Sequence, residues 1–155
     1  MLLEFTIKNY KSFVDEMSFS MMPVPKQTGL DYSILKEKTG SMMQKALCSA
    51  VIYGPNASGK TNIIGAMDTL KAIVLRGNIQ DSNVALSPNV ASSLLALIPN
   101  CDEAPSPTKF SISFTEKDLL ITYELVIDLG NFLNKDYPRK IVKEQLTVNK
   151  KEVFT

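Results

Sequence analysis

Two short stretches near the start of the chain alternate between apolar and polar side chains. Every second residue from Leu3 to Ile7 is apolar, and the same pattern returns from Met17 to Met21. A period of two residues is that of a β-strand with one buried face. The pattern predicts antiparallel strands over residues 2–9 and 14–21, which together form a β-hairpin within residues 1–22.

A longer apolar run and a helical pattern follow one another in the middle of the chain. Residues 46–54, ALCSAVIYG, are mostly apolar and end in glycine, which predicts a fully buried central strand. From Gly59 onward, apolar side chains recur every three or four positions, the period of a helix that buries one face. We expect this helix to continue to Arg76 and to end at Gly77. Residues 46–76 would then form a strand, a glycine-bearing turn and a helix.

Two other segments have the composition of surface connections. Residues 23–45 hold two prolines, two glycines and dispersed lysines, which favours a loop with at most one turn of helix at 32–37. Residues 77–107 are rich in Asn, Ser and Pro. Within them, Ser87 followed by proline is typical of a helix start. We therefore expect an irregular insertion that contains a short helix over 88–98.

The last part of the chain returns to alternation. Every second residue is apolar through KFSISF and through ITYELVI, and KIVKEQLTV follows as a further strand-like run. Residues 108–155 are therefore expected to form an antiparallel β meander, with turns near 116–118, 130–138 and 149–151. Together these elements predict an α/β chain in which antiparallel strands precede and follow a central strand–loop–helix unit.

Composition and charge exclude several classes of function. The chain has 155 residues, a formal net charge of +1 and no histidine. A near-neutral balance gives no general attraction to nucleic acids or membranes. The absence of histidine excludes Ser-His-Asp and Cys-His nucleophilic chemistry within these residues. Cys48 and Cys101 lack metal-ligand spacing and are interpreted as reduced thiols. Because there is no secretory signal and no apolar run of about 20 residues, we expect a cytoplasmic protein.

The stretch GPNASGKTN, residues 54–62, carries the clearest chemistry. Gly54, Gly59, Lys60 and Thr61 match the pattern G-x-x-x-x-G-K-[ST] without a gap. The glycines let successive N–H groups turn inward around a phosphate, and the helix that begins here adds the positive end of its dipole. Lys60 is expected to reach the β- and γ-phosphates of a nucleotide, and the Thr61 hydroxyl to bind Mg²⁺. An ordinary glycine-rich turn between a strand and a helix is the alternative.

The sequence around this loop also resembles a known group of ATPases. LLEFTIKNYKSF, followed about forty residues later by VIYGPNASGKTN, is similar to the opening of ABC-type ATPase heads of the SMC, RecF and OLD kind. In particular it resembles bacterial AAA-labelled ATPases allied to the OLD family, several of which belong to phage-defence systems. ITYELVID and KIVKEQLTV extend the similarity. The resemblance implies a P-loop NTPase fold with an ABC-ATPase-like N-terminal lobe. It also implies ATP and Mg²⁺ as ligands, and a second ATPase head as partner in a homodimer.

By position, the resemblance also assigns residues to the nucleotide. Asn56 and Ser58 are residue types that these heads place between the two glycines, and Asn62 is of the type that commonly follows their Mg²⁺-binding hydroxyl. Lys11 and Ser12 fall where the first hairpin of such heads turns back toward the phosphates, and a solvated lysine at a strand end is the alternative for Lys11. The nucleotide-binding residues are therefore expected to be Lys11, Ser12, Gly54, Pro55, Asn56, Ala57, Ser58, Gly59, Lys60, Thr61 and Asn62.

Groups that hydrolysis requires are missing from the sequence. Phosphoryl transfer needs a carboxylate to position Mg²⁺ and a residue that orients the attacking water. No apolar run ends in paired acids, and no serine-glycine-glycine signature occurs. Asp128 has no second acid beside it. Gln145 could be a glutamine that senses Mg²⁺, but its sequence context favours a position in the middle of a strand. We expect no catalytic residue in this chain and negligible ATP turnover by it alone. We also expect a longer protein whose later residues complete the ATPase and hold any DNA contact.

Two other functions stay open at the level of sequence. A regulatory module that binds ATP without hydrolysing it requires the same loop and none of the missing acids. A GTPase is suggested by Asn149, Lys150, Lys151 and Glu152, which are similar to the N-K-x-D motif that recognises guanine. The last residue is glutamate where aspartate is required, and a hairpin turn between two strands explains the four residues better.

Overall fold

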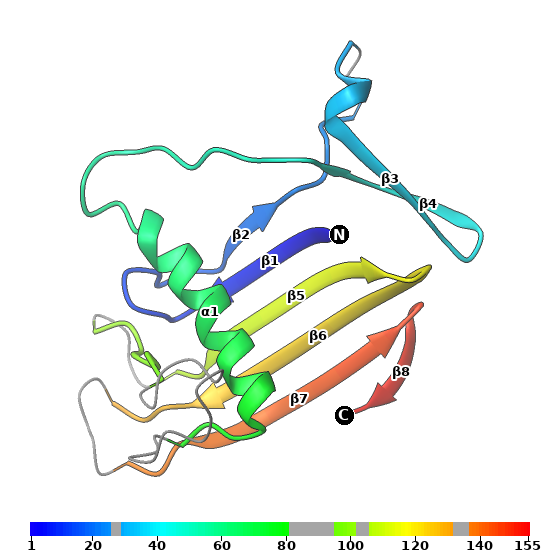
Figure 1. Ribbon diagram of the computed structural model, residues 1–155. Helices are drawn as coiled ribbons and strands as arrows, with labels where there is room; N and C mark the ends of the chain where they lie inside the picture. The colour runs from blue at the N-terminus through cyan, green and yellow to red at the C-terminus, as the bar shows by residue number, and fades with distance from the viewer. Residues whose placement is uncertain (26–28, 81–94, 102–105, 132–136) are drawn as a thin grey trace.

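The computed structural model describes residues 1–25, 29–80, 95–101, 106–131 and 137–155. Within these ranges the main feature is an antiparallel sheet of six strands in the order β2-β1-β5-β6-β7-β8 (Figure 1). Its strands are β1 (Leu2–Lys8), β2 (Met17–Ser20), β5 (Thr108–Glu116), β6 (Leu119–Asp128), β7 (Lys140–Val148) and β8 (Lys151–Phe154). The helix α1 (Lys60–Arg76) crosses one face of this sheet, and a separate hairpin of β3 (Ile34–Thr39) and β4 (Met42–Leu47) lies near the start of β1.

The face of the sheet that looks toward α1 is built from the alternating apolar positions. Ile7 of β1 pairs with Phe110 of β5, which pairs in turn with Leu125 of β6. These three side chains and Phe5 are fully buried. Each contributes about 1.5–3 kcal/mol by leaving water, so this row of side chains is the centre of the core.

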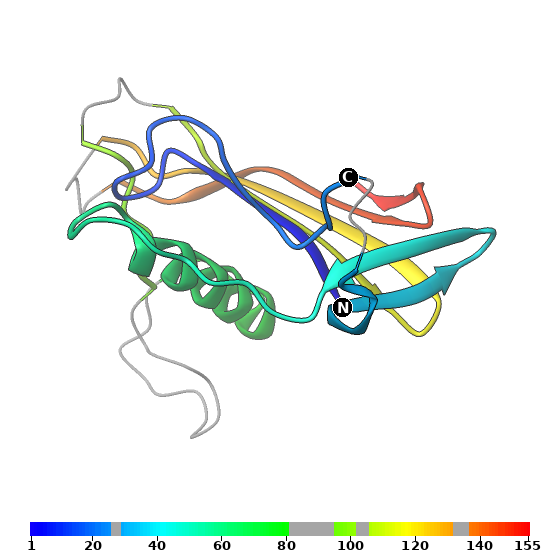
Figure 2. The same cartoon turned by 90° about the horizontal axis from the view of Figure 1, so that it is seen from above.

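The helix supplies the other half of the core. Leu70 and Ile73 lie on its buried stripe, and Figure 2 shows α1 on a single side of the sheet. Tyr10, which is fully buried, shares a hydrogen bond of 3.2 Å with the Thr69 hydroxyl. Its ring meets that of Phe110 edge-on, with 5.5 Å between the centroids. Tyr10 therefore joins the middle of the helix to the sheet. No helix in the described ranges is long and apolar enough to cross a bilayer.

The β3–β4 hairpin stands where a surface connection over residues 23–45 was expected, so that expectation was wrong. A short 3₁₀ turn (Asp31–Ser33) precedes β3, and no α-helix occurs at 32–37. The strands pair from Ile34 opposite Leu47 to Thr39 opposite Met42. Proline and glycine punctuate strands as well as loops, and a two-stranded ribbon that is mostly solvated lacks the alternation of a half-buried strand. Composition therefore could not distinguish this ribbon from a loop.

The buried central strand expected over residues 46–54 is not present, which is a second correction. β4 ends at Leu47, and residues 48–54 contain no strand. Val51 and Tyr53 are 85% and 90% exposed. A buried parallel strand needs neighbours that hydrogen-bond to both of its edges, and no strand in the described part of the chain pairs with this segment. Its apolar character alone therefore predicted the wrong environment.

The hairpin at the N-terminus and the meander at the C-terminus are found where alternation predicts them, as β1–β2 and β5–β8. The turns between β5 and β6 and between β7 and β8 each have two central residues with left-handed backbone: Lys117 and Asp118, then Asn149 and Lys150. This is the geometry of a two-residue turn that matches the twist of paired strands. The four residues similar to a guanine motif are thus a hairpin turn and the start of β8.

Two expectations fall partly outside the described residues. Of the helix predicted over 88–98, only residues 95–98 are described, and they have no helical structure. Of the connection predicted over 130–138, the described residues contain no strand. Leu95 and Leu97 are nevertheless buried in the core cluster, so the segment before β5 packs against the sheet without regular structure.

Glycine precedes and follows α1. Gly59 has a φ of 86° and Gly77 a φ of 66°, both left-handed. At Gly77, the N–H donates to the carbonyl of Ile73 at 2.9 Å, which ends the helix as predicted, and an added Cβ would meet nothing within 4 Å. At Gly59, an added Cβ would lie 2.8 Å from the Ser12 Oγ and 3.0 Å from the Phe13 Cζ. The turn that follows β1 therefore packs directly against the start of α1.

We predict that Gly59→Ala destabilises the fold more than Gly77→Ala. Both changes put a Cβ on left-handed backbone, at a cost of about 1 kcal/mol. Only Gly59→Ala adds a collision with Ser12 and Phe13, which raises the expected loss to about 2–4 kcal/mol. Urea unfolding followed by circular dichroism measures both losses. Equal losses would show that the turn after β1 does not press on Gly59.

Candidate functional site

Residues 54–59 form a loop at the N-terminus of α1. Gly54 to Ser58 are exposed, whereas Gly59 is buried. Ala57 and Gly59 have φ values of 64° and 86°, and left-handed residues among right-handed ones turn successive N–H groups toward one side. A Cβ on Gly54 would lie 2.9 Å from the Ser58 Oγ. Glycine at both ends therefore lets the loop close on itself.

Several N–H groups of this loop have no acceptor in the described part of the chain. Ser58 N–H makes only a long bond of 3.4 Å to the Pro55 carbonyl, and the first helical bonds run from Asn62 and Ile63 to the Gly59 carbonyl. A helix leaves its first N–H groups unsatisfied, and together with the helix dipole they favour an anion. The amides without a partner among the described residues are those of Asn56, Ala57, Gly59, Lys60 and Thr61.

The Lys60 ammonium group lies against the backbone of the same loop. Its Nζ donates to the carbonyls of Gly54 at 2.8 Å and Pro55 at 2.6 Å, and lies 3.5 Å from the Ser58 Oγ. Phosphate oxygens are charged acceptors and bind an ammonium more strongly than neutral carbonyls do. Lys60 can therefore exchange these carbonyls for a phosphate without leaving the loop.

The first turn of α1 offers two further polar side chains. Thr61 is exposed beside Lys60, so its hydroxyl is accessible to a ligand. Asn62 donates from Nδ2 to the Ser12 Oγ at 2.8 Å, and the structure thus brings Ser12 to the loop across fifty positions of sequence. The described residues contain no group of three acidic or cysteine side chains that could hold a metal ion. A Mg²⁺ ion at Thr61 would need its remaining ligands from phosphate and water, which is how proteins usually hold this ion.

Lys11 lies beside the helix and not over the loop. Its Nζ is 5.1 Å from the centre of the Tyr10 ring, a distance at which a cation is attracted to the ring face. A Cβ on Gly65, in the second turn of α1, would be 3.8 Å from the same Nζ. The structure therefore brings Lys11 near the N-terminal half of α1. A contact between Lys11 and nucleotide phosphates stays a prediction.

Sequence reasoning missed three residues around the turn that carries Lys11 and Ser12. Phe13 packs against Gly59, and Asn9 and Asn100 are buried polar side chains. Asn9 could have been recognised from the local sequence as a turn residue, because asparagine directly after a strand tolerates left-handed backbone. Asn100 could not have been recognised from the local sequence, because its contact with Asn9 spans 91 positions of sequence.

The acidic and amide residues considered for hydrolysis are engaged elsewhere. Asp128 accepts hydrogen bonds from the Tyr137 hydroxyl at 2.6 Å and the Gly130 N–H at 2.9 Å. These bonds, the tyrosine's first, stabilise the charged form and lower the pKa of Asp128. Gln145 donates to Glu152 at 2.7 Å. It sits in β7 between two residues that face α1, so its side chain lies on the opposite face of the sheet. Its interpretation as a mid-strand residue is confirmed.

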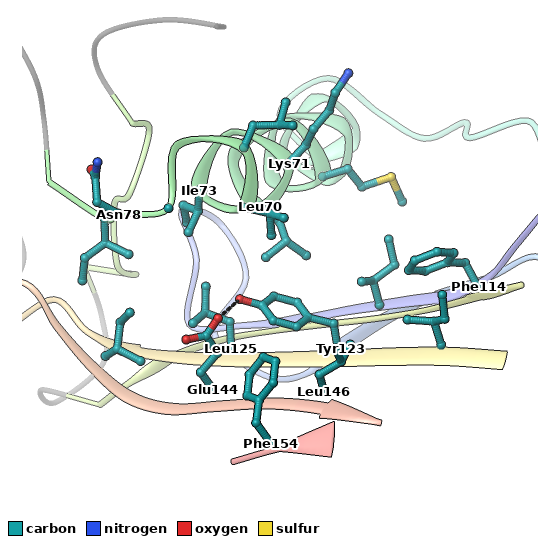
Figure 3. Close-up of a pocket in the computed structure, with 18 residues that line it drawn as sticks. Leu70, Lys71, Ile73, Asn78, Phe114, Tyr123, Leu125, Glu144, Leu146 and Phe154 are labelled. Atoms are coloured by element: carbon teal, nitrogen blue, oxygen red, sulfur yellow. Dashed lines mark hydrogen bonds between the residues drawn. The ribbon is translucent and has the colours of Figure 1, made fainter. Parts of the chain in front are cut away.

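The described residues also form a cavity away from the loop. It is an apolar groove of about 580 Å³ between the later turns of α1 and strands β5 to β8, lined by side chains such as Leu70, Ile73, Leu146 and Phe154 (Figure 3). On its floor the Tyr123 hydroxyl donates to Glu144 at 2.8 Å, and burial together with this bond raises the pKa of Tyr123. A groove with an apolar lining and a carboxylate is a poor binding site for phosphate, because a charged group is poorly solvated there. The loop remains the candidate site.

Comparison with known proteins gives one match. Residues 49–150 match a family described as "AAA domain, putative AbiEii toxin, Type IV TA system". The matched range includes the loop, α1 and strands β5 to β7. None of the curated proteins and none of the solved structures compared with the chain matches it. The matched range spans well over half of the 155 residues. The chain belongs to this family of AAA domains, and it is accordingly a nucleotide-binding domain of the P-loop ATPase type.

Proposed function

We propose that the chain binds Mg·ATP through residues 54–61, as the N-terminal lobe of an ABC-type ATPase allied to the OLD family. The phosphates would lie against the loop amides at the start of α1, with the Lys60 ammonium between the β- and γ-phosphates. A role in phage defence, or in another process linked to DNA, extends this proposal on the strength of the resemblance alone.

The observation that carries the proposal is the set of N–H groups without acceptors around Lys60. Five loop and helix amides, from Asn56 to Thr61, have no partner among the described residues, and the Lys60 ammonium lies against the carbonyls of Gly54 and Pro55 in the same loop. Unpaired amide donors in one loop beside a lysine suit the charge and the acceptor oxygens of a phosphate group.

The metal part of the proposal rests on Thr61. Its hydroxyl is exposed and follows Lys60 directly, so a Mg²⁺ ion bound to it would also touch the phosphates held by the loop. Mg²⁺ usually binds through few protein ligands plus substrate phosphates and water. When bound, the ion would neutralise phosphate charge. The chain would contribute one ligand to it, the Thr61 hydroxyl.

Hydrolysis needs groups that these residues do not supply. The sequence has no apolar run that ends in paired acids, and the described acids form no cluster of three. We propose that a second ATPase head, in a homodimer, and further acidic residues complete the catalytic site. A regulatory module that binds ATP without hydrolysis is the second candidate, favoured by the same missing acids. ATP turnover by the dimer distinguishes the two.

The guanine alternative loses its sequence support in the structure. Asn149 and Lys150 are the central residues of the β7–β8 turn. Asn149 uses its Oδ1 to accept the N–H of Leu120 at 2.9 Å, so its side chain serves the turn. Glu152 accepts the hydrogen bond of Gln145. A base-recognition role for these residues is therefore not proposed.

We predict that Lys60→Ala weakens Mg·ATP binding by about 100-fold or more, because charge-assisted contacts to two phosphates are lost. Isothermal titration calorimetry measures the affinity, and circular dichroism checks that the fold is retained. Lys71→Ala is the matched control, since Lys71 is exposed on the same helix and lines the apolar groove. Unchanged binding by Lys60→Ala would remove the loop from the proposal. A comparable loss in Lys71→Ala would move the nucleotide to the groove.

We further predict that Thr61→Val abolishes the gain in ATP affinity that Mg²⁺ provides. Valine keeps the shape of threonine and removes its hydroxyl. The affinity for ATP without Mg²⁺ should therefore stay within about threefold of the parent, a free-energy difference smaller than that of one neutral hydrogen bond. Thr61→Ser keeps the hydroxyl and should keep the Mg²⁺ effect. Titrations in the presence and absence of Mg²⁺ measure both. A full Mg²⁺ effect in Thr61→Val would exclude Thr61 as a ligand.

A further inference from the structure

The turn that follows β1 is held in a costly conformation. Asn9 and Lys11 have φ values of 49° and 50°. Left-handed backbone costs about 1–2 kcal/mol for a residue with a Cβ, and asparagine bears it better than lysine. A short turn with two such residues keeps its shape only where its surroundings determine it. Those surroundings are a set of hydrogen bonds to two distant segments.

Asn100 holds the turn from one side. Its Nδ2 donates to the carbonyl of Lys11 at 2.6 Å, and its backbone N–H donates to the Asn9 Oδ1 at 2.9 Å. The N–H of Lys11 donates to the carbonyl of Ile98 at 2.9 Å. Asn9 and Asn100 are 1% and 6% exposed. Hydrogen bonds buried to this degree are expensive to break, because the groups left behind cannot reach water.

Asn9 ties the same turn to the start of β5. Its Nδ2 donates to the carbonyl of Ser106 at 2.5 Å, and its own carbonyl accepts from the Thr108 hydroxyl at 2.6 Å. Every polar atom of the Asn9 side chain is therefore paired. Asn9 and Asn100 thus form a bridge between β1, the segment of residues 95–100 and β5.

The held turn carries the contacts to the phosphate loop. Ser12 accepts from Asn62, Ser12 and Phe13 lie against Gly59, and the Lys11 ammonium lies beside the second turn of α1. These three residues follow β1, which ends at Lys8, and backbone hydrogen bonds between Tyr10 and Phe13 close the turn locally. The bridge adds the buried hydrogen bonds that fix this turn against β5 and the segment of residues 95–100.

We propose that Asn9 and Asn100 are positioning residues of the nucleotide site. They lock the turn of residues 9–13 so that Lys11 and Ser12 meet the start of α1. This inference rests on the proposed function, namely that residues 54–61 bind Mg·ATP. The two asparagines touch no nucleotide; they act through the turn.

Asn100→Asp tests this directly. The change keeps the size of the side chain, but a carboxylate cannot donate to the Lys11 carbonyl. We expect Mg·ATP affinity to fall by about 5–10-fold, as for one lost buried hydrogen bond. Asn78→Asp, the same change at an exposed position, should leave affinity unaltered. If Asn100→Asp is too unstable to study, Asn100→Ser makes the same test with a hydroxyl too short to reach.

A double-mutant cycle separates positioning from a general structural effect. In a Lys11→Ala, Ser12→Ala background, Asn100→Asp should cause no further loss of affinity, because the groups it positions are gone. The inference would be overturned if Asn100→Asp lowered Mg·ATP affinity by the same factor in that background as in the parent. It would also be overturned if Asn100→Asp did not lower the affinity of the parent. A parent that binds no Mg·ATP, or a Lys60→Ala variant that binds normally, would instead overturn the proposed function.

A second readout does not depend on the nucleotide. Hydrogen exchange of the Lys11 and Phe13 amides reports whether the turn is locked, since these N–H groups donate to Ile98 and Tyr10. Asn100→Asp should speed the exchange of both by about tenfold or more, as expected when local opening becomes easier. Unchanged exchange would show that Asn100 does not hold the turn, whatever the chain binds.

Discussion

The structure depends on the packing of α1 against the face of β1, β5 and β6. Tyr10 is the central contact, because its ring lies on Phe110 of the sheet and its hydroxyl reaches Thr69 of the helix. A helix seventeen residues long has little stability by itself, so its position comes from the apolar stripe it buries. Since the candidate loop of residues 54–59 directly precedes this helix, the same packing determines where the loop lies. Fold and site therefore rest on one contact surface.

The parts of the fold that sequence predicted are those whose cause is local. The helix α1 (Lys60–Arg76) has a clear period, and Gly77 after it accepts left-handed backbone; both are visible in a short window of sequence. The β5–β8 meander shows alternation and two-residue turns. The loop itself was predicted because its glycines and lysine are neighbours in sequence.

The parts that sequence did not predict depend on partners far along the chain. The run before the loop is apolar enough for a buried strand, but burial requires neighbouring strands, and its exposed Val51 and Tyr53 lack them among the described residues. The β3–β4 ribbon is solvated over much of its surface, so it carries no alternating pattern. Asn100 matters through contacts with Asn9 and Lys11 that no local pattern announces.

The candidate site holds groups that suit binding more than catalysis. It offers amide donors, a lysine and a hydroxyl, which together suit the binding of phosphate and Mg²⁺. Such groups stabilise bound nucleotide, but transfer of a phosphoryl group to water also needs a positioned carboxylate and an oriented water. Membership of an AAA-domain family accounts for nucleotide binding, and no apolar run in the sequence ends in the paired acids that hydrolysis requires.

The most direct test of the central claim is a titration of the ¹⁵N-labelled chain with Mg·ATP, followed by amide NMR. The account predicts that the largest shifts occur at the amides of residues 56–61, with smaller shifts at Lys11 and Ser12. Apart from Ser58, the amides of residues 56–61 have no partner among the described residues and would gain a phosphate. Shifts confined to the groove between α1 and β5–β8, or no shifts at millimolar Mg·ATP, would contradict the account.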